Sequence, residues 1–419
     1  MNRRDFLAGT LAVAGGSRAF GIAPDQSESM EQPHEIDDRV VRCYLRSIMQ
    51  TSEHVEQFTH AWTPEESMRL GNGWTHDAEL GWVHSSAVHS DGVDGSKTYY
   101  HYETDGARKV VNSPEKRCRI HAYGNSFAHC DQVNDNETWE EYLAAHLQEP
   151  IRNYGVGGYG VYQAYRRMLK VERNNPAEYI VLNIWDDDHY RSLDSWRLIR
   201  FGQGSSCGFT LPHVRVDLRN NRCNQFDNLL KSPQDVARLR DEEFVFQSFK
   251  DDPVLKLVLA ARSEKTGSTR LTRPVAVSFG IPEEIASDSD VAQRLMQIHT
   301  EAALYASRQI ITWTEEFAAL NGKKLMLILS FGRSNMSNAL KGKPRFDQNF
   351  TDWLKTKSYP VLDMRDAFAR HYQSFRGEPD DFLRPYYNGH HTPAGNFLTA
   401  WALKPTVVSW LDPVPTPYR

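Results

Sequence analysis

A serine beside a glycine is the first residue of this chain that could do chemistry. Ser126 stands in the run Gly124-Asn125-Ser126, between a short apolar segment and an amphipathic stretch from Thr138 to Leu147. A serine hydroxyl is a weak nucleophile unless a base removes its proton. A tight turn between a strand and a helix would expose this hydroxyl and leave its N–H free, and Gly124 permits such a turn because it has no Cβ. The alternative is an ordinary turn in which the serine only caps a helix.

A second glycine-containing turn follows at residues 153–160. The hydrophobic pattern of residues 119–168 predicts strand, turn, helix, strand, turn, helix. Ligands of an open α/β sheet bind beyond the carboxyl ends of the strands, so Ser126 and these glycines should face one crevice. The N–H of Gly158 could then lie near the N–H of Ser126, and two such donors stabilise a developing oxyanion.

These two turns resemble the first two sequence blocks of the SGNH (GDSL-type) hydrolase family. The first block appears as Gly124-Asn125-Ser126, with Asn125 where the family usually has aspartate. The second block appears as Asn153 followed five residues later by Gly158. The resemblance implies that Ser126 is the nucleophile and that the Gly158 N–H is an oxyanion donor. It also implies a flavodoxin-like three-layer α/β/α sandwich with a parallel sheet.

The resemblance further implies a catalytic base just before the C-terminal helix. The phrase His-x-Thr-Pro-x-Gly-Asn points to His390, and His391 is the alternative. The aspartate expected shortly before the base is missing. Asn388 lies two residues before His390 and three before His391, and its side-chain oxygen could orient an imidazole, as in Cys-His-Asn proteases. A backbone carbonyl is the other candidate for this role.

The third family block departs most from the pattern. Asp187-Asp188 stand at the end of an apolar run where Asn-Asp is expected, and the preceding glycine is absent. A carboxylate cannot donate a hydrogen bond unless it is protonated. Asp187 can therefore serve as a third oxyanion donor only if burial keeps it neutral, and otherwise another group must donate. A metal site at residues 186–188 is an alternative, although consecutive strand residues face opposite ways.

The rest of the chain alternates helical and apolar strand patterns, which is typical of an α/β domain. We expect an SGNH hydrolase-like domain at residues 116–412, interrupted at about 191–285 by an insertion that forms either a substrate wall or a stabilising helical cap. Residues 37–115 should form an N-terminal extension that packs on this core. Its phrases Leu-Gly-Trp, ending at Trp82, and Asp-Gly-x-Arg, ending at Arg108, resemble segments that precede the nucleophile in bacterial family members.

Composition limits the partners of the protein. The 419 residues carry a formal net charge of −5 without a long basic run, so nucleic acid is an unexpected partner. Residues 1–30 resemble a twin-arginine export signal with its linker, because Arg3-Arg4 precede Phe6-Leu7 and a short, weakly apolar run. That run is too short for a transmembrane segment, and we expect no later one. The expected location is therefore periplasmic or extracellular.

Five cysteines are present, and disulfides can persist after export. Cys207 and Cys223 are the local pair we expect if a disulfide forms. The chain has no Cys-x-x-Cys motif of the kind that holds zinc.

The expected function is that of an exported serine esterase that hydrolyses an O-acyl ester, with a small-molecule or glycan O-acetyl ester as the substrate and no cofactor. Two alternatives stay open. The phrase around His390 also resembles the alginate-acetylation branch of the superfamily, which favours a polysaccharide O-acyltransferase. The departures at Asn125, at Asp187 and before His390 favour a carbohydrate-binding protein without activity.

Overall fold

The computed structural model describes residues 36–60, 63–70, 73–204, 208–263, 272–281 and 291–419. Its centre is a parallel sheet of five strands in the order β11-β10-β7-β5-β6. These strands are Ile120–Tyr123 (β5), Ile151–Asn153 (β6), Tyr179–Trp185 (β7), Lys324–Ser330 (β10) and Val361–Asp363 (β11). All four strand pairs run parallel. The central β7 is buried along almost its whole length, as expected for a strand covered on both faces.

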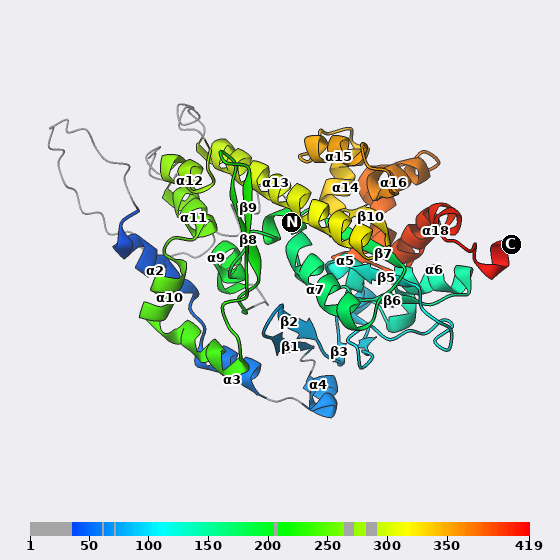
Figure 1. Ribbon diagram of the computed structural model, residues 1–419, viewed down its shortest axis with the longest axis horizontal. Coiled ribbons are helices and arrows are strands. Elements are labelled where there is room, and N and C mark those ends of the chain that lie inside the picture. Colours follow the sequence, from blue (N-terminus) through cyan, green and yellow to red (C-terminus); the bar gives the residue numbers. More distant parts are fainter. Residues whose placement is uncertain (1–35, 61–62, 71–72, 205–207, 264–271, 282–290) are drawn as a thin grey trace.

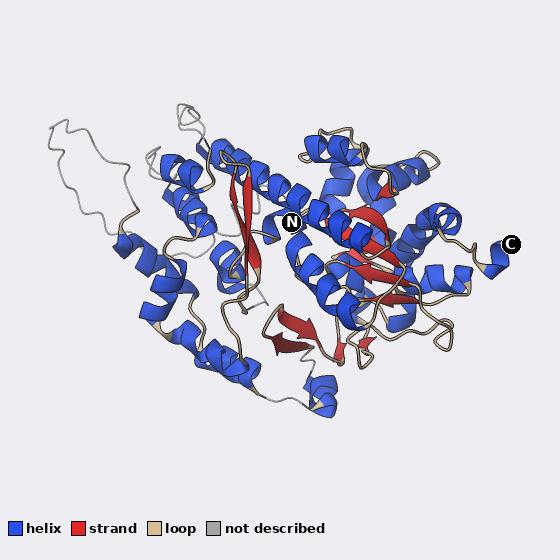
Figure 2. Cartoon of the chain, viewed as in Figure 1, coloured by secondary structure: helices blue, strands red, loops and turns tan. Residues whose placement is uncertain are grey.

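Helices cover both faces of this sheet, as Figures 1 and 2 show. One layer contains α7 (Val161–Asn174) and the long α13 (Val291–Leu320), which pack against each other. The other layer contains α6 (Trp139–Leu147), α16 (Met364–Tyr372) and α18 (Pro393–Trp410), in which α18 contacts both of the others. The expected α/β class with a parallel sheet flanked by helices is therefore confirmed, and it is compatible with the expected three-layer arrangement. None of the described helices is both long and apolar enough to span a bilayer.

Shorter elements complete the sheet domain at the carboxyl edge of the strands. They are the single-turn helix α5 (Ser126–His129), α14 (Arg333–Leu340), α15 (Gln348–Leu354), α17 (Pro379–Leu383) and the small hairpin of β12 (Tyr387–Asn388) and β13 (His390–His391). The hairpin contacts α5, which brings the C-terminal motif to the turn after β5.

The segment between β7 and α13 forms a mostly helical region with a hairpin that stays outside the five-stranded sheet. Its elements are α8 (Asp188–Arg191), α9 (Arg197–Phe201), β8 (His213–Asp217), β9 (Arg222–Phe226), the 3-10 helix η4 (Pro233–Arg240), α10 (Glu242–Phe249), α11 (Pro253–Ser263) and α12 (Thr272–Ser278). Cys207, the expected partner of Cys223, lies outside the described residues.

The N-terminal segment makes two different contacts. Its elements are α2 (Asp38–Ile48), α3 (Ser52–Thr59), α4 (Pro64–Leu70), β1 (Trp74–Asp77), β2 (Gly81–His84), β3 (Ala87–His89) and β4 (Thr98–Tyr100). Helices α2 and α3 pack on α10 and η4 of the inserted region rather than on the sheet, with an ion pair of 2.7 Å between Arg46 and Glu242. Only the later part reaches the sheet domain, where the Trp82 indole N–H donates to the Gly157 carbonyl. The leader at residues 1–30 falls outside the described residues.

Candidate active site

The turn after β5 fixes Ser126 at the first position of α5. A Cβ on Gly124 would come within 2.6 Å of the Asn183 carbonyl oxygen, so only glycine fits there. Asn125 caps the helix, because its side-chain oxygen accepts the Phe127 N–H at 2.6 Å. The Asn125 amide also donates to the buried carboxylate of Asp188. Asn125 thus both caps α5 and joins it to the residue three positions beyond β7.

The structure brings Ser126 and His390 together although 264 residues separate them. The Ser126 Oγ lies 2.8 Å from the His390 Nε2, which is hydrogen-bond distance for a nucleophile and its base. Ser126 is 4% exposed, whereas the His390 side chain is 30% exposed. Burial lowers the pKa of His390 below its usual value, and nearby Arg191 acts in the same direction, while Asp131 and Asp91 raise it. The ring is therefore mainly neutral at pH 7, as a base must be.

Gln132 orients the ring of His390. Its side-chain oxygen accepts both the His390 backbone N–H at 2.8 Å and the Nδ1–H at 3.0 Å. The orientation of the Gln132 amide follows from its other end, which donates to the Asp91 carbonyl at 3.0 Å. Gly389 has φ +80°, and a Cβ there would come 2.8 Å from the same Gln132 oxygen. This hydrogen bond leaves Nε2 as the nitrogen that can accept a hydrogen bond from the Ser126 hydroxyl.

Asn388 does not orient the base, contrary to expectation. It pairs with His390 across the small hairpin through the backbone, and its side-chain amide donates to the Asp91 carbonyl at 3.3 Å. Opposite positions of a strand pair place both side chains on one face, which puts Asn388 beside His390. The acceptor of the His390 Nδ1–H is nevertheless Gln132, from the loop after α5.

His391 is a core residue and is not the base. It is 3% exposed and lies among the rings of Phe127, Tyr387 and Phe368, at centroid distances of 4.8 to 6.0 Å. Burial lowers its pKa to about 3. Successive residues of a strand point to opposite faces. Since His390 faces Ser126, His391 faces the interior.

The turn after β6 packs directly on α5. The Asn153 side chain donates to the Ala128 carbonyl at 2.7 Å and accepts the Gly155 N–H at 2.9 Å. A Cβ on Gly155 would come within 2.2 Å of the His129 backbone nitrogen, so glycine permits this close approach.

Gly158 has φ +80°, and Arg197 holds its carbonyl by a hydrogen bond of 2.8 Å. In the described part of the chain, the backbone N–H groups of Ser126 and Gly158 donate to no protein group. Both N–H groups thus lack an acceptor within the described protein, which is one requirement of an oxyanion hole.

Asp187 is not an oxyanion donor. Its carboxylate accepts hydrogen bonds from Arg200 at 2.7 and 3.1 Å and from Arg191 at 2.9 Å. Burial would raise its pKa, but the two arginines outweigh burial and hold the pKa well below its usual value. An ionised carboxylate has no proton to donate.

The neighbours of Asp187 are also engaged by the protein. Asp186 accepts the Gly332 N–H at 3.3 Å and the side-chain amide of Asn335, while Asp188 accepts the Trp185 N–H at 2.8 Å. Arg191 donates to Asp188 at 3.4 Å as well as to Asp187, so donors of the protein itself engage all three acids. Among the described residues they do not form a group with the spacing of metal ligands.

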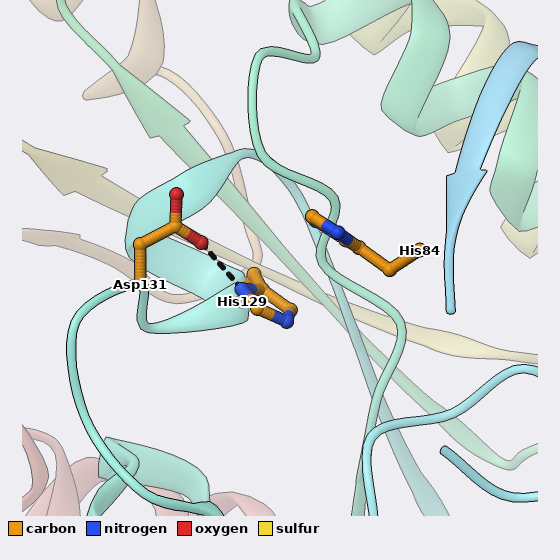
Figure 3. A group of neighbouring side chains, drawn as sticks. All are labelled: His84, His129 and Asp131. Atoms are coloured by element: carbon orange, nitrogen blue, oxygen red, sulfur yellow. Dashed lines mark hydrogen bonds and ion pairs between the residues drawn. The ribbon is translucent and has the colours of Figure 1, made fainter. Parts of the chain in front are cut away.

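Sequence reasoning missed a polar cluster beside the serine, drawn in Figure 3. His129 and Asp131 follow Ser126 on α5 and the next loop, and His84 comes from the end of β2. The rings of His84 and His129 stack with centroids 4.2 Å apart. The His129 Nδ1 lies 2.5 Å from Asp131, and its Nε2 lies 2.5 Å from the hydroxyl of Tyr102. The signal in the sequence was the presence of polar residues three and five positions beyond Ser126.

These three side chains also have the spacing of a metal site. Every ring nitrogen, however, already has a protein partner. The His84 Nε2 accepts the Gly157 N–H at 2.9 Å, and its Nδ1 lies 3.3 Å from the Gly73 carbonyl. The two nitrogens of His129 are engaged by Asp131 and Tyr102. A metal ion would have to break these bonds, so the arrangement fits a hydrogen-bonded cluster better than a metal centre.

The two N-terminal phrases support the loops of the site. The buried Arg108 donates to the carbonyls of His129 and Cys130 at 2.6 and 2.9 Å and to Val133 at 2.5 Å. It thereby fixes the loop that carries Asp131 and Gln132. Trp82 similarly holds the carbonyl of Gly157 at 3.2 Å.

The chain matches no known family model, and no curated protein matches it significantly. The function therefore has to be argued from the geometry of the site.

A separate apolar cavity of about 120 Å³ adjoins Trp185, which stacks on Phe127 at 5.5 Å. Its lining includes Leu257 and Ala261 of α11 and Leu295 and Met296 of α13. Neither Ser126 nor His390 lines it. The inserted region thus borders a cavity next to the site. The residues that line this cavity do not lie over Ser126.

Proposed function

We propose that the protein is a serine esterase that hydrolyses O-acyl esters. The observation that carries the proposal is the 2.8 Å contact between the Ser126 Oγ and the Nε2 of His390, whose Nδ1 is held by Gln132. A serine hydroxyl at hydrogen-bond distance from an oriented, neutral imidazole is an activated nucleophile.

In the proposed reaction, the Ser126 Oγ attacks the ester carbonyl carbon while His390 takes its proton. The N–H groups of Ser126 and Gly158 stabilise the oxyanion of the tetrahedral intermediate. His390 then protonates the leaving alcohol, and water hydrolyses the acyl-enzyme with His390 again as the base. Gln132 is uncharged and can only orient His390. The nearest negative charge is Asp131, whose Oδ2 lies 3.9 Å from the His390 Nε2 and can stabilise the imidazolium.

We also propose that the domain is of the SGNH hydrolase type, with a short-chain substrate. Ser126, Asn153 with Gly158, and His390 occur in the family order, and the parallel sheet supports this assignment. The side chains beside the serine are polar, which suits a small acyl group on a hydroxylated alcohol, such as an O-acetylated sugar, better than a long acyl chain.

The hydrolysis of p-nitrophenyl acetate tests the proposal directly. The wild-type protein should release p-nitrophenol, and Ser126→Ala should reduce the rate at least about 10³-fold. Ser409→Ala, at an exposed position near the far end of α18, is the matched control and should keep wild-type activity. Equal rates for wild type and Ser126→Ala would contradict the proposal and favour a binding protein.

We further propose that residues 1–30 direct the protein out of the cytoplasm by the twin-arginine route. Replacing Arg3 and Arg4 together by lysine should keep the protein in the cytoplasmic fraction of a host with this pathway. Unchanged export of the double variant would contradict this proposal.

A further inference from the structure

We infer that Asp131 holds the water that deacylates the Ser126 acyl-enzyme, and that it thereby favours water over an alcohol as the acyl acceptor. The inference rests on the proposed esterase function and adds a residue and an acceptor preference to it. If it holds, the protein is a hydrolase rather than a polysaccharide acyltransferase.

The position of Asp131 carries the inference. Its backbone N–H donates to the Ser126 carbonyl at 3.0 Å, which ties it to the nucleophile. Its Oδ2 lies 3.9 Å from the His390 Nε2, the atom that contacts the Ser126 Oγ. Two atoms at this separation can each lie at about 2.8 Å from one shared water molecule. A water in this position would be next to both the base and the acylated oxygen.

The surrounding residues leave the Oδ2 of Asp131 open. The Tyr102 O–H donates to the His129 Nε2, so that the Nδ1–H of the same ring donates to the Asp131 Oδ1. Burial lowers the pKa of His129, which keeps the ring neutral and fixes this tautomer. The Oδ2 accepts no hydrogen bond from the described residues, and the side chain is 22% exposed.

Gly157 leaves room beside this oxygen. A Cβ at position 157 would come 3.1 Å from the Asp131 Oδ2, closer than nine in ten such contacts in proteins. Glycine therefore keeps space for a small molecule next to the carboxylate. The carboxylate itself stays charged, because the hydrogen bond from His129 acts against burial and its pKa is lowered.

The chemistry of the second half-reaction explains the preference for water. The water oxygen attacks the acyl carbon and gives one proton to the His390 Nε2, while its second hydrogen is donated to the Asp131 Oδ2. The new carbon–oxygen bond forms as the bond to the Ser126 Oγ breaks, His390 returns the proton to Ser126, and a carboxylic acid leaves. An alcohol has one hydroxyl hydrogen, so once His390 accepts it, none is left to donate to the Asp131 carboxylate. The carboxylate therefore stabilises attack by water and gives no such stabilisation to attack by an alcohol.

Asp131→Asn tests the inference with little structural change, because an asparagine oxygen can still accept the His129 N–H. Acylation and deacylation are followed separately with p-nitrophenyl acetate in stopped-flow experiments. Deacylation should slow about 10- to 100-fold, with acylation changed much less. A burst of p-nitrophenol should appear, and kcat and KM should fall together. With methanol present, the ratio of methyl acetate to acetate should rise about tenfold. Asp352→Asn, at an exposed carboxylate of α15, is the charge-matched control. It should leave the two rates, the burst and the product ratio unchanged.

Tyr102→Phe provides a second test that keeps the charge of Asp131. It removes the hydrogen bond that fixes the tautomer of His129, and it should raise the ratio of methyl ester to acid by a smaller factor.

Equal slowing of acylation and deacylation in Asp131→Asn with an unchanged product ratio would overturn the inference, because Asp131 would then act only through the charge of His390. A wild-type enzyme that acylates but prefers methanol to water would also overturn it. If wild-type Ser126 is never acylated, the proposed function fails, and the inference falls with it.

Discussion

Two neighbouring strands of the sheet, β5 and β7, are each followed by polar residues, but the protein engages these residues differently. After β5, the chain presents Ser126 to His390 and leaves one oxygen of Asp131 open. After β7, three consecutive acids at 186–188 are all engaged by arginine, amide or backbone donors of the protein itself. The denser charged run is therefore held by the protein's own donors, and the serine is the residue that we propose to carry the chemistry.

This difference shows what makes a strand end available to a ligand. Both runs lie at the carboxyl edge, where ligands of α/β sheets bind. A polar side chain at this edge can bind a ligand only if its neighbours orient it and still leave one of its hydrogen-bonding atoms without a protein partner. Gln132 and His129 do this for His390 and Asp131, whereas Arg191 and Arg200 neutralise Asp187 completely. Mutations at the end of β5 should therefore affect activity, and mutations at the end of β7 should affect stability.

The largest effect is expected from His390→Gln. It removes the base, so kcat/KM for p-nitrophenyl acetate should fall at least about 10³-fold with the melting temperature little changed. His391→Gln is the control from the adjacent position. It disturbs a buried aromatic cluster and should lower stability by about 1–3 kcal/mol while the folded protein stays active. If His391→Gln abolished activity and His390→Gln did not, the assignment of the base would be wrong.

Asp187→Asn should show the opposite behaviour. It removes the charge that faces Arg200 and Arg191, and a buried arginine without its full counter-charge should cost about 2–4 kcal/mol of unfolding free energy. Denaturant unfolding measures this loss, and esterase activity of the folded protein should stay within about twofold. A large loss of activity at unchanged stability would place Asp187 in the site after all.

Gln132→Ala should have an intermediate effect on activity. It frees the His390 ring, and misplacement of a base by about 1 Å lowers the rate by up to about 10²-fold. We therefore expect a loss of about 10- to 100-fold in kcat/KM. Asn388→Ala is the matched control, because among the described residues this amide donates to the Asp91 carbonyl and not to His390, and its activity should remain near wild type. Equal losses in the two variants would return the orienting role to Asn388.

The smallest effect is expected from Asp188, which follows β7 and makes the stability of the protein depend on pH. Burial raises the pKa of Asp188 to about 7 despite the nearby Arg191. The folded state favours the protonated form of Asp188. The contribution of this group to the free energy of unfolding is therefore complete below about pH 4 and is lost as the pH rises towards 7. Asp188→Asn should remove this dependence and gain about 1 kcal/mol or more at pH 8 relative to wild type. Denaturant unfolding at pH 5 and pH 8 measures it, and parallel changes in both proteins would contradict the assignment.

Much of the fold could be predicted because its signals are local. The apolar runs at 179–185 and 324–330 form β7 and β10, and the periodic stretch before Gly322 forms α13. The order of Ser126, Gly158 and His390 was also visible in the sequence, and the structure brings Ser126 and His390 into contact. Local periodicity and motif order were sufficient for these features.

The residues that tune the site could not be predicted, since their partners come from distant segments. Gln132 looks like a loop residue until the hairpin from the C-terminus places His390 on it. Tyr102 and Arg108 belong to the N-terminal segment and act only through α5 and the loop that follows it. Asp187 appeared to be a site residue because Arg200 lies thirteen residues further along the chain, in α9.

The central claim is that Ser126 is a nucleophile activated by His390, and covalent trapping tests it most directly. A fluorophosphonate should add to the wild-type protein with loss of fluoride, and peptide mass spectrometry should find the adduct on Ser126. Ser126→Ala should not react, and His390→Gln should react at least about 10²-fold more slowly. An unmodified wild-type protein, or an adduct on a residue other than Ser126, would contradict the claim.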